Sequence, residues 1–299
     1  MTEASTPELS SLTPGQRLQR ALQKEKPLAV VGTINAYCAL LAQQAGFNAL
    51  YLSGAGVANA SFGLPDLGIT TLDNVLEDTR RITAITQLPL IVDADTGFSD
   101  PARTAHALIG AGAAAMQIED QVDSKRCGHR PGKVLVSSGE MQERIKAANN
   151  GKSNPDFMII ARTDAYAVEG LDAAIERAKQ YSSAGADIIF AEALTRLDEY
   201  KKFCHSVKVP VLANITEFGK TPLFNMDELG NAGVQLVLYP LTAFRAMSAA
   251  ALNVYQTLKT ERTQATLIDR LQTREELYEI LNYYQYEKAL DDKLSSGKE

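Results

Sequence analysis

One short segment of the chain, DSKRCGHRPGK (residues 123–133), concentrates side chains that bind anions and move protons. They are Lys125, Arg126, Cys127, His129, Arg130 and Lys133. Neighbouring cations favour the thiolate form of a cysteine and make it reactive, so Cys127 is a candidate for proton transfer or nucleophilic attack, with Lys125 and His129 as catalytic neighbours. The alternative is a solvated basic loop that binds nothing. A structural zinc site is disfavoured, because C-x-H lacks the second pair of ligands that such a site needs.

Carboxylates form a second group of candidate residues. Asp93 and Asp95 alternate along one apolar segment, so on a strand their side chains share a face. Two acids in such a place are costly unless they are solvated, hydrogen-bonded or joined by a cation. With Glu119 and Asp66 they make an all-oxygen set that suits Mg²⁺, or Mn²⁺ as a substitute, holding several waters. The alternative is that these carboxylates cap the strand by accepting backbone N–H bonds, and their spacing leaves both interpretations open.

Three arginines are candidates for holding an acidic ligand. Arg162 and Arg245 stand at or just beyond the ends of predicted strands, and Arg274 lies in the C-terminal tail. A guanidinium pairs with a carboxylate through two parallel hydrogen bonds, which is the usual way to hold a multiply charged acid. Each of them could instead be an ordinary salt-bridge partner.

Short apolar runs rich in β-forming residues alternate with amphipathic or Ala-rich stretches. The runs span residues 28–33, 49–53, 88–95, 114–120, 157–163, 187–193, 209–215 and 234–240. Several joints into the runs read AGFNAL, AGAAAM, AGADII and AGVQLV, where Gly supplies the left-handed residue that ends a helix. Eight such units predict a (β/α)8 TIM-type barrel, and the runner-up, an open doubly wound sheet, lacks a G-x-G-x-x-G fingerprint.

The polar residues of these runs gather at their C-terminal ends, which share one rim of a barrel. They are Ser53, Asp93, Asp95, Glu119, Arg162, Glu192, Asn214, Thr216 and Arg245. The cationic segment follows the fourth run and therefore leaves from the same rim. Residue types and spacing thus predict a barrel enzyme that acts on a small polyanion.

The composition sets the outer limits of this interpretation. The chain has 299 residues, of which 45% are hydrophobic, and we expect a single domain with a flexible N-terminus (1–12), a barrel core (28–258) and a helical tail (259–299). Thr13 and Pro14 predict an extra helix before the barrel. A net charge of −6 argues against nucleic-acid and membrane-surface binding. Three widely spaced cysteines and the lack of a secretory signal or long apolar span favour a cytoplasmic protein.

Motifs along nearly the whole chain after about residue 15 resemble the isocitrate lyase and phosphoenolpyruvate mutase superfamily. They are KRCGH, YLSGAG (51–56), LPDLG (64–68), VDADTG (92–97), IEDQ (118–121), ARTDA (161–165), NITEFG (214–219) and NYYQYE (282–287). Within the superfamily the resemblance is greatest to the branch that cleaves (2S,3R)-2-methylisocitrate to pyruvate and succinate in the methylcitrate cycle of propionate catabolism. A short isocitrate lyase, a related enzyme acting on oxaloacetate or phosphonopyruvate, and a non-catalytic anion-binding barrel are the alternatives.

The resemblance implies a role for each matching residue. Asp95 is expected to ligate Mg²⁺ directly, and Asp93, Glu119 and Asp66 to act mainly through metal-bound waters. The tricarboxylate substrate is expected to contact Ser53, Gly54, Ala55, Cys127, Gly128, Arg162, Glu192, Asn214, Ile215, Thr216, Arg245 and Arg274. Two positions depart from the pattern: relatives often have Gly at Ala55 and His at Gln117, and Gln117 cannot titrate near neutrality.

The implied reaction is a retro-aldol cleavage. Tyr51 is the candidate base or relay for the substrate hydroxyl, and Cys127 is the acid that protonates the carbanion. The resemblance also implies a homotetramer in which C-terminal helices are exchanged between subunits, so that Arg274 reaches a pocket completed by assembly. The tail itself predicts a helix, because Thr273 and Glu276 have the spacing of a capping box.

Overall fold

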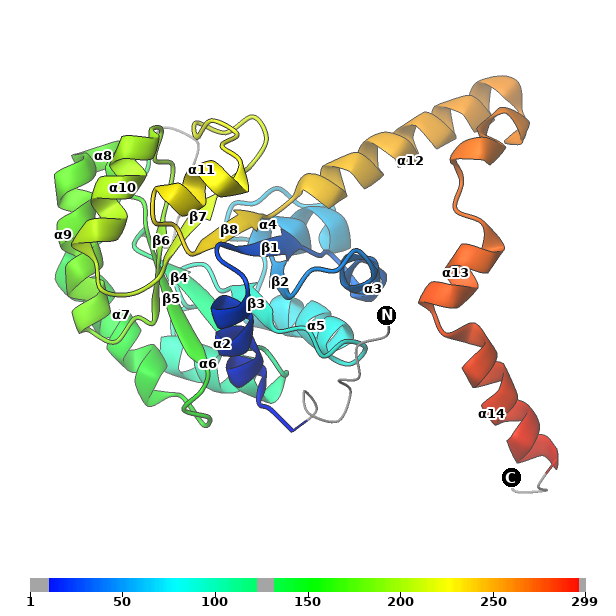
Figure 1. Cartoon of the computed structure of the whole chain (residues 1–299), viewed down its shortest axis with the longest axis horizontal. Coiled ribbons are helices and arrows are strands. Elements are labelled where there is room, and N and C mark those ends of the chain that lie inside the picture. Colours follow the sequence, from blue (N-terminus) through cyan, green and yellow to red (C-terminus); the bar gives the residue numbers. More distant parts are fainter. Residues whose placement is uncertain (1–10, 123–131, 296–299) are drawn as a thin grey trace. The chain divides into compact units, whose positions relative to one another are not determined.

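A closed barrel of eight parallel strands organises the chain, with the strands in sequence order around it (Figure 1). The computed structural model describes residues 11–122 and 132–295. The strands are β1 (Leu28–Gly32), β2 (Ala49–Leu52), β3 (Leu90–Asp93), β4 (Ala115–Glu119), β5 (Met158–Thr163), β6 (Ile188–Ala191), β7 (Val211–Asn214) and β8 (Leu236–Tyr239). Because β8 pairs with β1, the sheet has no free edge and all eight strand ends converge on one rim.

Helices connect the strands and surround them (Figure 1). In the first part of the chain they are α2 (Pro14–Lys24), α3 (Ala36–Gln44), α4 (Gly54–Gly56), the π-helix η1 (Val57–Ser61), α5 (Leu72–Thr83), α6 (Pro101–Gly110), α7 (Ser138–Asn150), α8 (Tyr166–Glu169), α9 (Leu171–Ser183), α10 (Leu197–Ser206) and α11 (Met226–Asn231). Then follow α12 (Thr242–Glu261), the 3₁₀ helix η2 (Ala265–Arg270), α13 (Arg274–Ile280) and α14 (Tyr283–Ser295).

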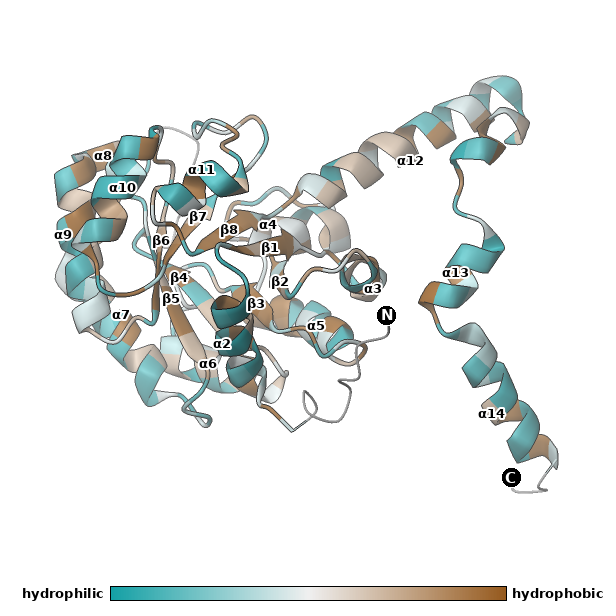
Figure 2. Ribbon diagram, in the orientation of Figure 1, coloured by the Kyte–Doolittle hydropathy of each residue, from teal (hydrophilic) through white to brown (hydrophobic). Residues whose placement is uncertain are grey.

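Strand alternation divides the core into two clusters. Inward-facing residues such as Tyr51 and Ile91 fill the barrel, and Leu18 of α2 packs with this inner cluster. Outward-facing residues such as Leu52 and Met116 pack under the surrounding helices. Figure 2 shows the result as hydrophobic strands enclosed by helices whose outer faces are hydrophilic. Both faces of every strand are therefore buried, as a parallel sheet requires.

Local signals predicted this architecture. Each of the eight apolar runs contains one strand, and the capping boxes begin α2 and α13 at Thr13 and Thr273. The four joint glycines all have left-handed φ angles, as predicted: Gly46 (89°), Gly112 (85°), Gly185 (105°) and Gly233 (94°). The short helices α4, α8 and α11 were not predicted, because three to six residues carry too little periodicity to register as a helix.

The chain divides into two compact units, Met1–Phe244 and Arg245–Glu299, with the boundary inside α12. The assignment of a single domain stays a prediction. In the second unit, α12, α13 and α14 bury no residue, and Tyr278 stacks on Tyr283 with 4.1 Å between ring centroids. None of the helices in the described ranges is long and apolar enough to cross a membrane.

Candidate active site

The acids at the end of β3 lie against the start of α4. The backbone N–H of Gly54 donates to Asp93 Oδ2 at 3.0 Å, and the N–H of Asp95 donates to Asp93 Oδ1 at 3.2 Å. A methyl group on Gly54 would stand 3.2 Å from an oxygen of both Asp93 and Asp95, so any larger residue would push the two carboxylates outward by a few tenths of an ångström. Asp95 itself has a left-handed φ of 50°, which Asp tolerates better than most residues. Asp93 therefore has the strand-capping bonds of the alternative interpretation, and both carboxylates converge on one point.

Arg162 on β5 lies among three carboxylates on the neighbouring part of the rim. Its guanidinium is 3.0 Å from Asp164, 3.5 Å from Glu119 and 3.6 Å from Glu192. It also lies over the ring of Phe190, 5.3 Å from the centroid. Burial alone would lower the pKa of Arg162, but the three carboxylates outweigh it and raise the pKa well above its ordinary value. Arg162 is thus a permanently charged group whose plane is held from several sides.

Tyr51 and Gln117 form a polar pair inside the barrel, below the rim acids. The Tyr51 hydroxyl donates to Gln117 Oε1 at 2.7 Å. Burial, together with the negative charge of Asp93, raises the pKa of Tyr51 well above its ordinary value of about 10. The amide nitrogen of Gln117 is buried and has no hydrogen-bond partner among the described residues. Tyr51 is therefore a neutral phenol whose proton points at an amide.

The ends of β6 and β7 carry further predicted residues of the rim. Asn214 Nδ2 donates to Glu192 Oε2 at 3.4 Å, which joins the two strand ends. Ser53, Ile215 and Thr216 are buried beside their strand ends, and Ala55 is half-buried in α4. The structure thus brings most of the predicted residues of the first unit to one rim, as a barrel enzyme requires.

Sequence reasoning missed Asp164 and its pairing with Lys133. Lys133 belongs to the cationic segment, but its Nζ is buried and lies 2.7 Å from Asp164 Oδ1. Asp164 also accepts from Gln121 Nε2 at 3.4 Å. The signal was the Arg-x-Asp spacing within ARTDA, because residues two apart on an extended chain share a face. A carboxylate at that spacing indicates a partner for Arg162.

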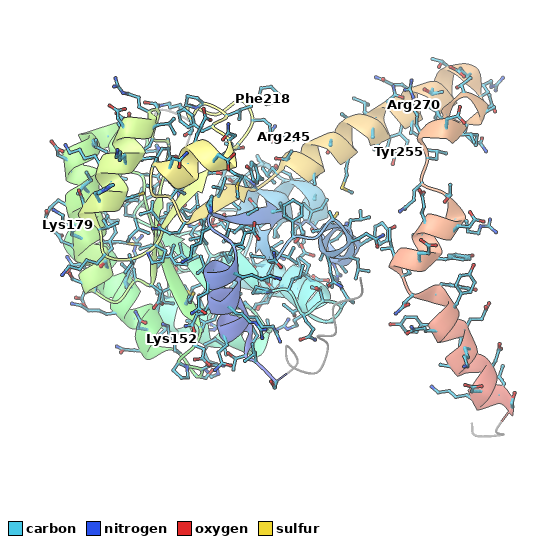
Figure 3. All side chains as sticks on the ribbon, in the orientation of Figure 1. Lys152, Lys179, Phe218, Arg245, Tyr255 and Arg270 are labelled. Carbon is cyan, nitrogen blue, oxygen red and sulfur yellow. The ribbon has the colours of Figure 1, made fainter. Side chains whose placement is uncertain are left out.

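The remaining predicted residues fall into three groups. Lys125, Cys127, Gly128 and His129 fall outside the described residues. Asp66 is half-buried between η1 and α5. Arg245, labelled in Figure 3, and Arg274 belong to the second unit.

The chemistry of the rim acids fits a hard divalent cation with few protein ligands. Asp93, Asp95 and Glu119 offer only carboxylate oxygens. No group of three or more His, Cys, Asp or Glu residues within 11–122 and 132–295 is arranged as a ready-made metal cage. Mg²⁺ keeps several waters and takes only one or two carboxylates from the protein, so this arrangement suits Mg²⁺ better than a metal that needs a full protein cage.

Comparisons with known proteins agree with this geometry. A family model described as phosphoenolpyruvate phosphomutase matches residues 18–259. The chain is 60% identical over 288 residues to 2-methylisocitrate lyase of Escherichia coli (strain K12), covering 95% of this chain and 97% of that protein.

Two solved structures extend the likeness. A 2,3-dimethylmalate lyase, described as a member of the PEP mutase/isocitrate lyase superfamily, has a TM-score of 0.85 at 32% identity, covering 93% of this chain and 94% of that one. A phosphonopyruvate hydrolase in complex with oxalate and Mg²⁺ has a TM-score of 0.83 at 28% identity, covering 95% and 100%. Fold, rim and sequence therefore point to one superfamily.

Proposed function

Because the chain belongs to the phosphoenolpyruvate phosphomutase family and is a carbon–carbon lyase, we propose that it cleaves 2-methylisocitrate to pyruvate and succinate. The observation that carries this proposal is the pairing, on one rim, of two converging acids with a fixed guanidinium. A cation held at Asp93 and Asp95 and the charge of Arg162 would together bind a polyanion that has a hydroxyl beside a carboxylate. The high identity to a relative of that name supports the choice of substrate.

Asp95 is the proposed direct ligand of Mg²⁺, with Asp93, Glu119 and Asp66 acting through its waters. When bound, the ion supplies a positive charge that lowers the pKa of the substrate hydroxyl and stabilises the forming carbonyl. Mn²⁺ is the proposed substitute, since it takes the same oxygen ligands. The structure of phosphonopyruvate hydrolase with Mg²⁺ supports an ion at this kind of site.

The proposed reaction breaks the bond between C2 and C3 of the substrate. The hydroxyl on C2 loses its proton and becomes the ketone of pyruvate, while the bonding electrons move to C3 as a succinate carbanion. Tyr51 suits the role of relay better than that of base, because its raised pKa keeps it protonated. Asn214 and Thr216 at the end of β7 are the proposed hydrogen-bond donors to the developing charge, with Arg245.

Cys127 is the proposed acid that delivers a proton to C3. The cations of its segment favour the thiolate, whereas a bound polyanion favours the thiol. Substrate binding would therefore restore the proton that the last step consumes. Lys125 and His129 are its proposed catalytic neighbours, and Gly128 contributes backbone to the substrate.

A substrate panel tests the proposed function. Purified protein with Mg²⁺ should release pyruvate and succinate from (2S,3R)-2-methylisocitrate and should be silent in EDTA. A small apolar contact for the extra methyl group is worth about 1–3 kcal/mol, so isocitrate should have a tens- to hundreds-fold lower kcat/KM. Equal or better kcat/KM with isocitrate would make the chain a short isocitrate lyase, and full activity in EDTA would overturn the metal.

The finer biological assignments are proposals as well. We propose a cytoplasmic homotetramer that exchanges its C-terminal helices, with Arg274 contributed by assembly, in the methylcitrate cycle of propionate catabolism. Apolar side chains of α14 support an assembly role, since Tyr286 is 70% and Leu294 81% exposed. Light scattering of the full chain tests the assembly, and a stable monomer at all concentrations would contradict it.

A further inference from the structure

Lys133 and Asp164 form a buried ion pair that the proposed reaction does not yet use. Their side chains are 2% and 0% exposed, and the Nζ–Oδ1 distance is 2.7 Å. Removing one partner of a buried pair leaves an uncompensated charge, so such pairs are kept only where geometry is good and further hydrogen bonds satisfy them. Asp164 meets that condition, because Gln121 and Arg162 also donate to it.

Asp164 binds Arg162 edge-on. Arg162 Nε donates to Asp164 Oδ2 at 3.0 Å, and Nη2 donates to Asp164 Oδ1 at 3.2 Å. This two-point contact fixes the plane of the guanidinium, and the ring of Phe190 supports one face of it. The remaining nitrogen, Nη1, points toward Glu119 at 3.5 Å. The contact with Asp164 therefore occupies the Nε–Nη2 edge of Arg162 and leaves Nη1 on the side of Glu119.

Lys133 offsets the charge that this contact brings. Arg162 is already within 3.6 Å of Glu119 and Glu192, so a third carboxylate makes the rim more negative. A negative rim repels a polyanionic substrate. The ammonium of Lys133 cancels the charge of Asp164 at 2.7 Å while leaving its contact with Arg162 intact.

We propose that Asp164 and Lys133 are positioning residues for the lyase reaction: Asp164 orients Arg162, and Lys133 cancels the charge that Asp164 adds to the anion pocket. The inference rests on the proposed function for its substrate. It assigns the last cation of the segment 123–133 to the support of the rim rather than to contact with substrate.

A double-mutant cycle on the Mg²⁺-loaded full chain tests this proposal. Lys133→Gln should raise KM for 2-methylisocitrate by roughly tenfold or more, because Asp164 keeps Arg162 but loses its second cation and the rim gains one net negative charge. Asp164→Asn should lower kcat, because Arg162 loses its orientation. In the double variant KM should return toward the wild-type value while kcat stays low, so the KM effects should depart from multiplicativity by roughly tenfold or more.

A second Lys–Asp pair, partly exposed and away from the rim, provides the control. Lys152, labelled in Figure 3, lies 3.3 Å from Asp187, and both residues precede their strands at the opposite end of the barrel from the rim. Lys152→Gln and Asp187→Asn should change the melting temperature but neither KM nor kcat.

The outcomes separate the two proposals. If the wild-type protein does not cleave 2-methylisocitrate, the proposed function is overturned. The positioning roles are judged instead by the ratios of variant to wild-type KM and kcat. KM effects that multiply independently, or a double variant with wild-type kcat, would overturn the positioning roles. If Lys133→Gln alone does not fold, recovery of folding in the double variant, with low kcat and near wild-type KM, supports the proposal, and a double variant that also fails to fold overturns it.

Discussion

The two halves of the rim hold their charges by different means. At the ends of β2 and β3, backbone N–H groups of Gly54 and Asp95 hold Asp93, and the glycine brings two acids together. At the ends of β4, β5 and β6, side chains hold one another, with Arg162 shared among three carboxylates. Backbone contacts fix an acid without adding charge, so the first half stays negative and suits a cation. Side-chain ion pairs fix the Arg162 guanidinium in a set orientation, so the second half offers one oriented positive charge to an anion.

The largest effect on activity is expected at the ends of β2 and β3, where Asp93 and Asp95 lie. Asp95→Ala should lower kcat/KM by about a thousandfold or more at every Mg²⁺ concentration, because several kcal/mol of charge stabilisation depend on the ion. Asp93→Ala should recover partly with excess Mg²⁺, since Asp93 already accepts two backbone N–H bonds and its proposed contact with the ion is through water. Activity measured across a Mg²⁺ titration distinguishes the two variants. Recovery of Asp95→Ala by excess metal would contradict the division of roles.

At the ends of β4, β5 and β6, loss of the Arg162 charge should lower the stability of the fold as well as substrate binding. Arg162→Met leaves buried carboxylates without their cation, so the free energy of unfolding should fall by about 3–5 kcal/mol. The exposed pair Arg196–Asp198, at 2.7 Å, is the control, and Arg196→Met should leave the free energy of unfolding nearly unchanged. Urea unfolding measures both variants. Equal losses of unfolding free energy in the two variants would mean that the rim ion pairs stabilise the fold no more than an exposed pair does.

Tyr51 carries no charge, so its substitution tests a hydrogen bond rather than an ion pair. Tyr51→Phe removes the bond to Gln117 and should lower kcat by about a hundredfold. Because burial and Asp93 raise the pKa of Tyr51, its phenol is protonated at neutral pH in the wild type. The shape of the kcat–pH profile should therefore be unchanged in the variant. Disappearance of an ionisation limb near neutrality would assign Tyr51 the role of base instead.

The smallest effect is expected behind the rim, at Asp120. This buried carboxylate accepts from Thr163 Oγ1 at 2.8 Å and Tyr181 OH at 2.9 Å, and burial raises its pKa. A raised pKa in the folded state means that the protonated form is favoured there. Its contribution to stability is complete below the ordinary value of 3.8 and is lost as pH rises through the folded-state pKa.

Asp120→Asn cannot titrate, so the unfolding free energy of the wild type relative to the variant should decline as pH rises above about 4, by about 1.4 kcal/mol in total for each unit by which folding raises the pKa of Asp120. Urea unfolding at a series of pH values measures this difference. A difference that stays flat with pH would show that Asp120 is ionised in both states.

Most of the fold could be predicted because its signals are local. Apolar runs, joint glycines and capping boxes each act within a few residues, and strand periodicity alone placed Asp93, Glu119 and Arg162 at strand ends. The short helices α4 and α11 escaped prediction, since tertiary packing rather than periodicity holds so few residues helical.

What the sequence by itself determined was therefore that residues such as Asp93, Glu119 and Arg162 stand at strand ends on the rim. Only the tertiary structure decided which of them touch. Lys133 and Asp164 are 31 residues apart, and Tyr51 and Gln117 are 66 apart, so no local pattern pairs them. Their pairing depends on how the closed barrel sets neighbouring strands in register, and on burial, which leaves a charged or polar side chain no stable alternative to the partner that the fold provides.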